Sequence, residues 1–191
     1  MRVKICGITS PADALLAEAA GADAIGVVLF SASPRCITPE SARDIFDAVP
    51  ALTRVCVTHS TEPGELQSIC AIRPDALQIS CQVCVPPECR AGIIRMVGPA
   101  DPLPPEADAL IVDGSHGRGQ PFDQAFACTI VRTARVPVYL AGGLSPENVG
   151  AAIRAVRPHG VDVASGVEHE PGRKDPVKVS AFVAAAREAF L

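Results

Sequence analysis

Short apolar runs alternate with segments of helical pattern along the whole chain, and this alternation limits the possible folds more than any other feature. Eight such runs occur in the 191 residues, at 3–6, 24–30, 54–58, 76–79, 93–97, 109–113, 136–141 and 161–165. Most are continuously apolar, as expected for parallel strands that are covered on both faces. Eight strands separated by helices favour a closed (β/α)₈ barrel, or TIM barrel, over an open sheet.

Helix start signals lie between these runs. Ser10-Pro11 and Thr38-Pro39 each combine an N-cap hydroxyl with a proline in the first turn. We expect further helices from Ser145-Pro146-Glu147 through Ala155 and over about residues 177–189.

Residues 82–108 lack room for two normal helices. Little chain separates residue 82 from the fifth run, and the proline-dense segment 99–105 cannot form a regular helix. We therefore expect reduced helices after the fourth and fifth strands. This reduction would fit one barrel domain into residues 1–191, although such barrels usually need about 250 residues.

Composition argues against several classes of protein. The net charge of −4 does not provide the basic surface of a nucleic-acid-binding protein. No segment approaches the roughly 18 consecutive apolar residues of a membrane helix, and the first residues lack the apolar core of a signal peptide. We therefore expect a cytoplasmic protein without nucleic-acid or membrane partners.

The eight cysteines do not indicate a disulfide framework, because nothing suggests secretion. Cys81, Cys84 and Cys89 have a C-x2-C-x4-C spacing that resembles half of a metal site. The next cysteine, Cys128, is too distant to complete it at a usual spacing. We expect no metal and no cofactor.

Reactive side chains lie where the predicted strands end, which is where barrels of this class carry their active sites. Cys6 ends the first strand and Asp113 the sixth, and Asp162 lies within the eighth. Arg35 follows the second strand, in the loop that contains Ser33 and Pro34. These four residues are the candidates for acid, base and substrate contacts.

Small residues follow the last two strands. Gly142 and Gly143 come after the seventh strand, and Ser165 and Gly166 come after the eighth. Loops at these two places frequently bind phosphate in barrels, because their backbone N–H groups can approach an anion. The alternative is that these glycines only allow tight turns.

Several motifs resemble those of the phosphoribosylanthranilate isomerase family, and together they cover nearly the whole chain. They are Lys4-Ile5-Cys6-Gly7-Ile8-Thr9, Ser33-Pro34-Arg35, Ile111-Val112-Asp113, Ala141-Gly142-Gly143-Leu144, Val161–Glu168 and Gly172-Arg173-Lys174-Asp175.

The resemblance implies an Amadori rearrangement in tryptophan biosynthesis, in which a phosphorylated aminoaldose becomes an aminoketose. By this resemblance Cys6 is the general base, Asp113 the general acid and Arg35 the ligand of the anthranilate carboxylate, with Asp162 as a further site carboxylate. The partner implied is a small phosphorylated aminosugar, and the chain is expected to be a monomer or a homodimer.

Lys4 is grouped with the substrate-binding residues. It shares strand parity with Cys6 and should lie one layer deeper in the barrel. A buried lysine needs a partner, so we hypothesise that Lys4 pairs with Asp162 and biases Cys6 toward the thiolate. Glu168 and Asp175 are interpreted as capping or solvated residues.

The fourth strand departs from the family pattern. The family usually ends it with Gln-Leu-His-Gly, whereas this chain has Gln78-Ile79-Ser80-Cys81, so the histidine is replaced by Ser80. The third strand also differs, with Val57-Thr58-His59-Ser60 where the family has Val-Phe-Val-Asn.

Two alternatives stay open at this point. One is another phosphosugar-binding barrel enzyme, such as an epimerase, although the Lys-Ile-Cys-Gly opening argues against it. The other is a degenerate barrel that binds phosphorylated ligands without catalysis. The changes in the fourth strand favour this second alternative, and the presence of both Cys6 and Asp113 opposes it.

Overall fold

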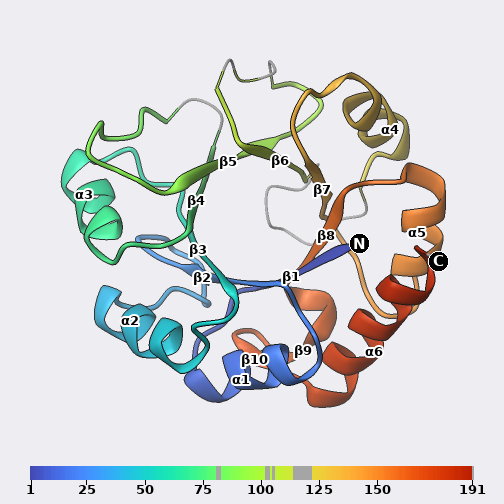
Figure 1. Cartoon of the computed structure of the whole chain (residues 1–191), viewed down its shortest axis with the longest axis horizontal. Helices are drawn as coiled ribbons and strands as arrows, with labels where there is room; N and C mark the ends of the chain where they lie inside the picture. The colour runs from blue at the N-terminus through green and yellow to red at the C-terminus, as the bar shows by residue number, and fades with distance from the viewer. Residues whose placement is uncertain (81–82, 102–103, 105, 114–121, 191) are drawn as a thin grey trace.

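Eight parallel strands close into a barrel in sequence order (Figure 1). The structure is a computed structural model that describes residues 1–80, 83–101, 104, 106–113 and 122–190. The strands are β1 (Arg2–Cys6), β2 (Ala24–Val28), β3 (Thr53–Val57), β4 (Ala76–Ser80), β5 (Gly92–Val97), β6 (Ala109–Val112), β7 (Val138–Leu140) and β8 (Gly160–Val163). All eight predicted strands are confirmed, with ends that differ by at most two residues.

The ring closes where the first strand pairs with the last. Arg2 lies opposite Gly160, and Lys4 lies opposite Asp162. Residues of β1 and β8 therefore contribute to one surface inside the barrel, although more than 150 residues of chain separate them.

Six helices surround the ring in the described part of the chain (Figure 1). They are α1 (Pro11–Ala19), α2 (Pro39–Ala48), α3 (Pro63–Ala71), α4 (Gln124–Thr133), α5 (Val149–Val156) and α6 (Pro176–Glu188). The side chains of Ser10 and Thr38 accept hydrogen bonds from the first turns of α1 and α2, as predicted, and Asp175 caps α6. The described residues between β4 and β5, and between β5 and β6, contain no helix, which agrees with the expected reduction.

The helix expected from Ser145 begins later than predicted, at Val149. The side chain of Asn148 holds the preceding loop instead. Its Oδ1 accepts from the backbone N–H of Ser145 at 2.8 Å, and its Nδ2 donates to the carbonyl of Gly143 at 2.8 Å. These bonds give residues 143–148 a loop conformation that competes with the helix.

The apolar core has three parts, one large and two small. The larger lies between the barrel and its helices and includes Ile5, Leu77 and Phe182, all fully buried. The smaller parts fill the inside of the barrel, where Val57 and Met96 belong to the apolar lining. Among the described residues, no helix is both long and apolar enough to cross a membrane.

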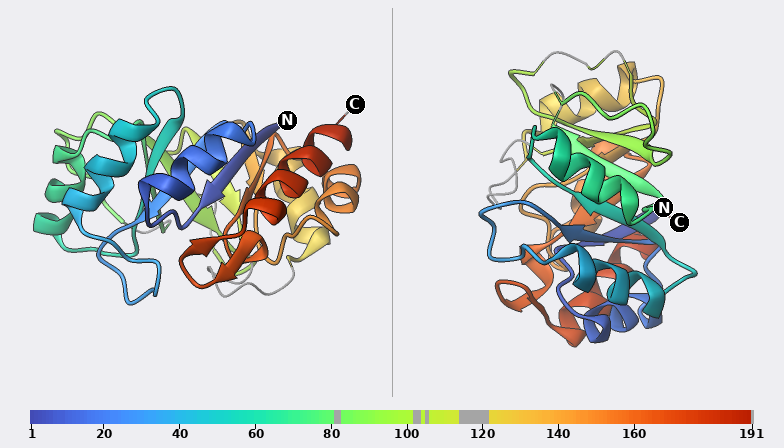
Figure 2. Two further views of the ribbon diagram at one scale, coloured as in Figure 1. Left: turned by 90° about the horizontal axis from the view of Figure 1, so that it is seen from below. Right: turned by 90° about the vertical axis from the view of Figure 1, so that its left-hand side faces the viewer.

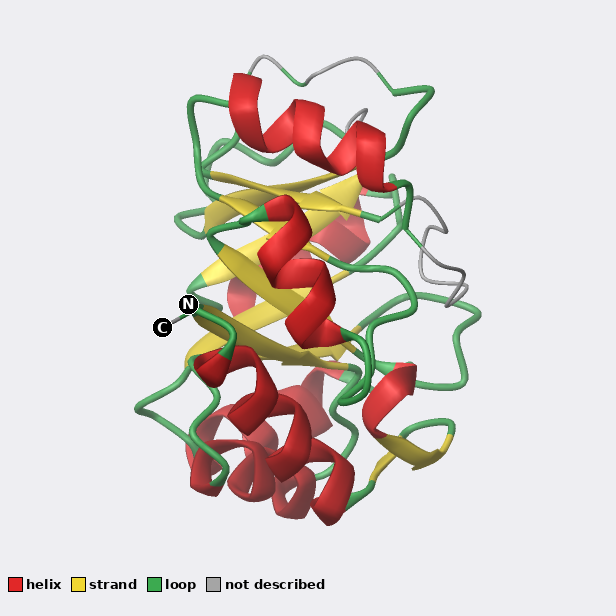
Figure 3. Ribbon diagram, turned by 90° about the vertical axis from the view of Figure 1, so that its right-hand side faces the viewer, coloured by secondary structure: helices red, strands yellow, loops and turns green. Residues whose placement is uncertain are grey.

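A short hairpin after β8 was not predicted. The 3-10 turn η1 (Ser165–Val167) leads into β9 (Glu168–Glu170), which pairs with β10 (Arg173–Lys174) in antiparallel orientation. Figures 2 and 3 show this hairpin at the end of the barrel opposite the two chain termini. The strands run toward that end, so the hairpin stands beside the barrel mouth.

Candidate active site

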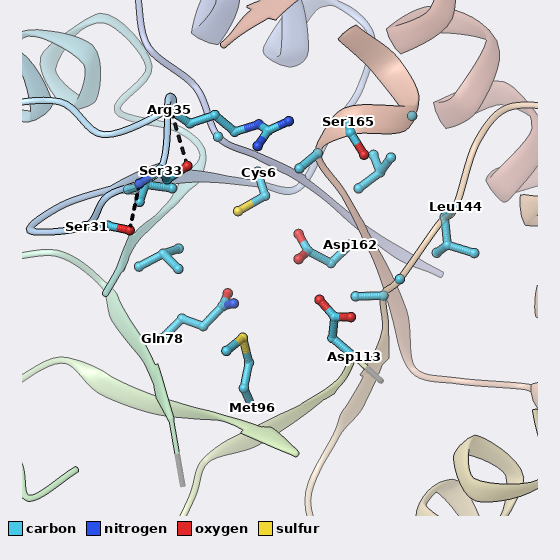
Figure 4. Close-up of a pocket in the computed structure, with 18 of the residues that line it drawn as sticks. Cys6, Ser31, Ser33, Arg35, Gln78, Met96, Asp113, Leu144, Asp162 and Ser165 are labelled. Carbon is cyan, nitrogen blue, oxygen red and sulfur yellow. Dashed lines mark hydrogen bonds between the residues drawn. The ribbon is translucent and has the colours of Figure 1, made fainter. Parts of the chain in front are cut away.

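One cavity of about 540 Å³ lies at the carboxyl ends of the strands, a size typical of small-molecule sites. Its lining brings together most of the residues predicted for the site, namely Cys6, Arg35, Asp113, Asp162, Gly142, Gly143, Ser165 and Gly166. In Figure 4 the thiol of Cys6 and the carboxylates of Asp113 and Asp162 face one common space.

Lys4 is not among the lining residues but lies beneath them, 1% exposed. Its Nζ is 2.8 Å from Oδ1 of Asp162, so the predicted pairing is confirmed. Gly26 on the neighbouring strand leaves room for this arrangement. A Cβ at Gly26 would lie 2.9 Å from Sγ of Cys6 and 3.1 Å from Nζ of Lys4.

Two opposing influences set the pKa of Cys6. Burial raises the pKa of its thiol, and the ammonium of Lys4 lowers it, with burial the larger effect. The net result is a raised pKa. Lys4 therefore acts on Cys6 in the predicted direction, toward the thiolate, but the removal of the thiol from water has the larger effect.

Lys4 itself stays charged in this setting. Burial lowers its pKa, but the charges of Asp162 and Cys6 and the hydrogen bond to Asp162 outweigh burial and raise it. The protein therefore holds a fixed positive charge directly below the thiol.

Arg35 is fixed by Glu168 at the barrel mouth. Its Nε donates to Oε1 of Glu168 at 2.8 Å and its Nη2 donates to Oε2 at 2.6 Å, a two-pronged ion pair. Lys174 reaches the same carboxylate at 3.0 Å and also donates to the carbonyl of Ala164 at 3.2 Å.

The interpretation of Glu168 as a capping or solvated residue is therefore wrong, since the residue is 6% exposed and joins two cations. Burial raises the pKa of Glu168, but the hydrogen bonds and charges of Arg35 and Lys174 outweigh it and lower the pKa. No local sequence pattern indicates this contact, because Arg35 and Glu168 are 133 residues apart.

Gly7 allows Arg35 to cross the end of β1. The backbone of Gly7 has φ +71°, and a Cβ there would lie 2.5 Å from Cδ of Arg35. A side chain at residue 7 would therefore displace the arginine from the cavity wall.

The predicted phosphate loops approach each other closely. Gly142 and Gly143 have φ values of +93° and +63°, which favour glycine. A Cβ at Gly166 would lie 1.8 Å from the carbonyl oxygen of Leu144, so only glycine lets the loop after β8 meet the loop after β7. The resulting concave backbone suits an anion such as phosphate.

Sequence reasoning missed Gln78 of β4, which lines the cavity and is 3% exposed. The position of a polar residue in the middle of an apolar strand was the available signal. At the end of the same strand Ser80 does not line the cavity, but its hydroxyl lies 3.4 Å from Nδ1 of His59, which does. The loop after β3 thus supplies a histidine near the place where the family pattern has one on β4.

The structure describes two of the three cysteines of the C-x2-C-x4-C cluster, since Cys81 lies outside the described residues. Cys84 is exposed and Cys89 is half-buried, both as free thiols. Within the part of the chain that the structure describes, no group of three or more potential ligands is arranged to hold a metal ion.

Comparison with known proteins gives the same family as the motifs. The family model for N-(5'-phosphoribosyl)anthranilate (PRA) isomerase matches residues 100–185. A protein from Methanoregula boonei named N-(5'-phosphoribosyl)anthranilate isomerase is 56% identical over 191 residues, which are 99% of this chain and 98% of that protein. Another of that name, from Haloferax volcanii, is 39% identical over 98% of this chain and 94% of its own length.

Solved structures agree. The phosphoribosyl anthranilate isomerase of Thermus thermophilus is 40% identical, with a TM-score of 0.85 over 98% of this chain and 99% of its own. A second isomerase, solved with reduced 1-(o-carboxyphenylamino)-1-deoxyribulose 5-phosphate, is 32% identical, with a TM-score of 0.80 and coverage of 98% and 99%. The chain therefore belongs to the N-(5'-phosphoribosyl)anthranilate isomerase family.

Proposed function

We propose that this chain converts N-(5'-phosphoribosyl)anthranilate to 1-(2-carboxyphenylamino)-1-deoxyribulose 5-phosphate, the Amadori rearrangement of tryptophan biosynthesis. The observation that carries the proposal is a single cavity faced by the Cys6 thiol and the Asp113 carboxylate (Figure 4). The solved relative that holds the reduced product analogue supports the same substrate.

The reaction needs one acid and one base acting on the same sugar. Asp113 donates a proton to the ring oxygen as the C1–O bond breaks, and the anilino nitrogen supplies the electron pair that forms C1=N. The thiolate of Cys6 then takes the proton from C2, and the released electron pair forms C1=C2 while the C=N π electrons return to nitrogen. The resulting enol becomes the ketone when its O–H proton leaves and C1 gains a proton.

Arg35 and the glycine loops hold the two anionic ends of the substrate. Glu168 occupies Nε and Nη2 of Arg35, which leaves Nη1 for the anthranilate carboxylate. The phosphate is bound by backbone N–H groups around Gly143 and Gly166. Lys4 acts on the site from below, through Asp162 and Cys6, and does not contact the substrate directly.

The partner required by this scheme is one small phosphorylated aminosugar. The protein acts as a monomer or a homodimer, and a solved family member is described as dimeric in its natural form. As a biosynthetic isomerase it works in the cytoplasm, which fractionation of the producing cells would test.

The decisive test follows the loss of substrate fluorescence with purified wild-type protein, Cys6→Ser and Asp113→Asn. Each substitution removes an acid–base group, so kcat/KM should fall by about 10²- to 10⁴-fold. Cys128→Ser, on the outer helix α4, is the matched control and should retain wild-type activity. Wild-type turnover that survives both active-site substitutions would contradict the assigned roles, and an inactive wild type would favour the degenerate barrel.

A further inference from the structure

An amide without a partner lies on the wall of the catalytic cavity. Oε1 of Gln78 is the one buried side-chain nitrogen or oxygen, within the described residues, that lacks a hydrogen-bond partner. The residue is 3% exposed, yet its side chain lines the cavity. Figure 4 shows its amide end pointing into the space that Cys6 and Asp113 also face.

The neighbours of Gln78 cannot satisfy this amide. In the strand register Gln78 lies opposite Val57 of β3 and Ile94 of β5, and Met96 lines the same wall. These side chains are apolar, and an unpaired amide among them destabilises the folded protein. Rotation about the last side-chain bond of glutamine is soft, so the unpaired Oε1 can turn toward a donor in the cavity.

The chemistry of an amide selects the part of the substrate that it can bind. Its oxygen only accepts hydrogen bonds, so the ligand group must donate one. Carboxylate and phosphate cannot donate, and Arg35 and the glycine loops already serve them. A sugar hydroxyl both donates and accepts, and it therefore complements both ends of an amide.

We propose that Gln78 binds a ribose hydroxyl of the substrate and thereby orients the sugar between Cys6 and Asp113. The identity of the ligand rests on the proposed isomerase function. This hydrogen bond would form only in the complex. The amide is therefore unpaired in the free protein, and the sugar hydroxyl supplies its partner.

Gln78→Met tests the proposal, because it keeps the length of the side chain and removes both polar atoms. We expect kcat/KM to fall about tenfold or more, which corresponds to about 1.4 kcal/mol. Affinity for ribose 5-phosphate should fall by a similar factor, whereas affinity for inorganic phosphate, which has no sugar hydroxyl, should stay within about twofold. The Tm should not fall, because an unpaired amide has been removed.

An amide with a merely structural role would give a different pattern, with a lower Tm and equal weakening of both phosphate ligands. That pattern, or a kcat/KM within about twofold of wild type, would overturn the proposal. Gln67→Met is the matched control, since Gln67 is exposed on α3 and bonds only to Glu88 at 3.4 Å. It should leave every measurement unchanged.

A second variant covers the case in which Gln78→Met does not fold. Gln78→Asn keeps the amide but withdraws it by one bond, so it should also weaken ribose 5-phosphate selectively. The two-ligand comparison separates this proposal from the isomerase function. If the wild type proved inactive as an isomerase, a selective loss of ribose 5-phosphate binding in the variants would still support the proposed role of Gln78. An equal loss of affinity for both phosphate ligands, or no loss, would reject that role.

Discussion

Cys6 lies where burial and a fixed positive charge act on the pKa of its thiol in opposite directions. Burial raises the pKa of its thiol, and the fixed charge of Lys4 works against that rise. A stronger conjugate base removes a carbon-bound proton more readily, but less of it is present at neutral pH. The thiolate of Cys6 is therefore a stronger base, but a smaller fraction of Cys6 is ionised at neutral pH.

A pH profile measures this directly. Because the pKa of Cys6 is raised, the thiolate fraction and kcat/KM of the free enzyme should still be rising with pH above the ordinary thiol value of about 8.5. Alkylation of Cys6 by iodoacetamide, followed by mass spectrometry of the peptide that contains this residue, should show the same late rise. A midpoint below about 7 would mean that positive charge outweighs burial.

Lys4 provides a second test at the residue scale. Lys4→Met leaves the Asp162 carboxylate unpaired inside the barrel, so the free energy of unfolding should drop by about 3–5 kcal/mol. The double variant Lys4→Met/Asp162→Leu removes both charges and should recover much of that loss in urea unfolding. Its activity should stay low, since the charge below Cys6 and the Asp162 carboxylate of the cavity wall are both missing. Full activity in the double variant would show that Lys4 serves only to neutralise Asp162.

Among the elements, the hairpin β9–β10 connects two sides of the cavity mouth. Glu168 of β9 holds Arg35 from the loop after β2, and Lys174 of β10 holds the carbonyl of Ala164, next to the proposed phosphate loop. A change in the hairpin should therefore affect substrate binding at both ends.

Glu168→Gln tests this connection. It leaves Arg35 and Lys174 without their shared counter-charge, so KM should rise about tenfold or more, and the free energy of unfolding at pH 7 should drop by about 3 kcal/mol. The pKa of Glu168 is lowered in the folded protein, so its stabilising contribution is full above the ordinary value of about 4.3 and is lost as pH falls through the folded pKa. The stability difference between wild type and variant should shrink over that acidic range.

Glu170→Gln is the control for that experiment. Glu170 lies on the same strand β9, but its ion pair with Arg173 is exposed, at 3.5 Å. Such pairs contribute at most about 1 kcal/mol, so KM should not change. Similar effects of the two substitutions would mean that the hairpin tolerates no loss of charge and that Glu168 has no special role.

The loop after β8 allows a steric test. A Cβ at Gly166 would overlap the backbone of Leu144, so Gly166→Ala should destabilise the protein by about 1–3 kcal/mol and weaken the binding of inorganic phosphate. Gly64→Ala in α3, where a Cβ would meet nothing within 4 Å, should be neutral or slightly stabilising. Unchanged phosphate affinity in Gly166→Ala would remove this loop from the phosphate site.

The sequence was sufficient for the strands and for most helix starts, because these depend on local patterns such as the Ser10 and Thr38 caps. It also placed Cys6 and Asp113 at strand ends, from which barrel closure brings them together. It could not place Glu168, whose partners depend on how distant loops meet, nor the start of α5, which the side chain of Asn148 decides. The net pKa of Cys6 also depended on burial, which only the packed barrel determines.

For the whole molecule, α6 contributes to stability through Phe182, which is fully buried in the core between the helices and the barrel. Phe182→Ala should lower the free energy of unfolding by about 3–5 kcal/mol. At about 2–4 °C per kcal/mol for a chain of this size, Tm should drop by roughly 6–20 °C. Exposed Phe190, just after α6, is the control, and Phe190→Ala should change Tm by little. A small effect at residue 182 would mean that α6 is peripheral to stability.

The pairing of β1 with β8 has a consequence for protein synthesis. Cys6 and Lys4 of β1 are translated more than 150 residues before Asp162 of β8. A nascent chain therefore carries an incomplete site, with Lys4 lacking its counter-ion, until β8 has been translated. Catalytic competence should appear abruptly with the final strand rather than grow as the chain lengthens.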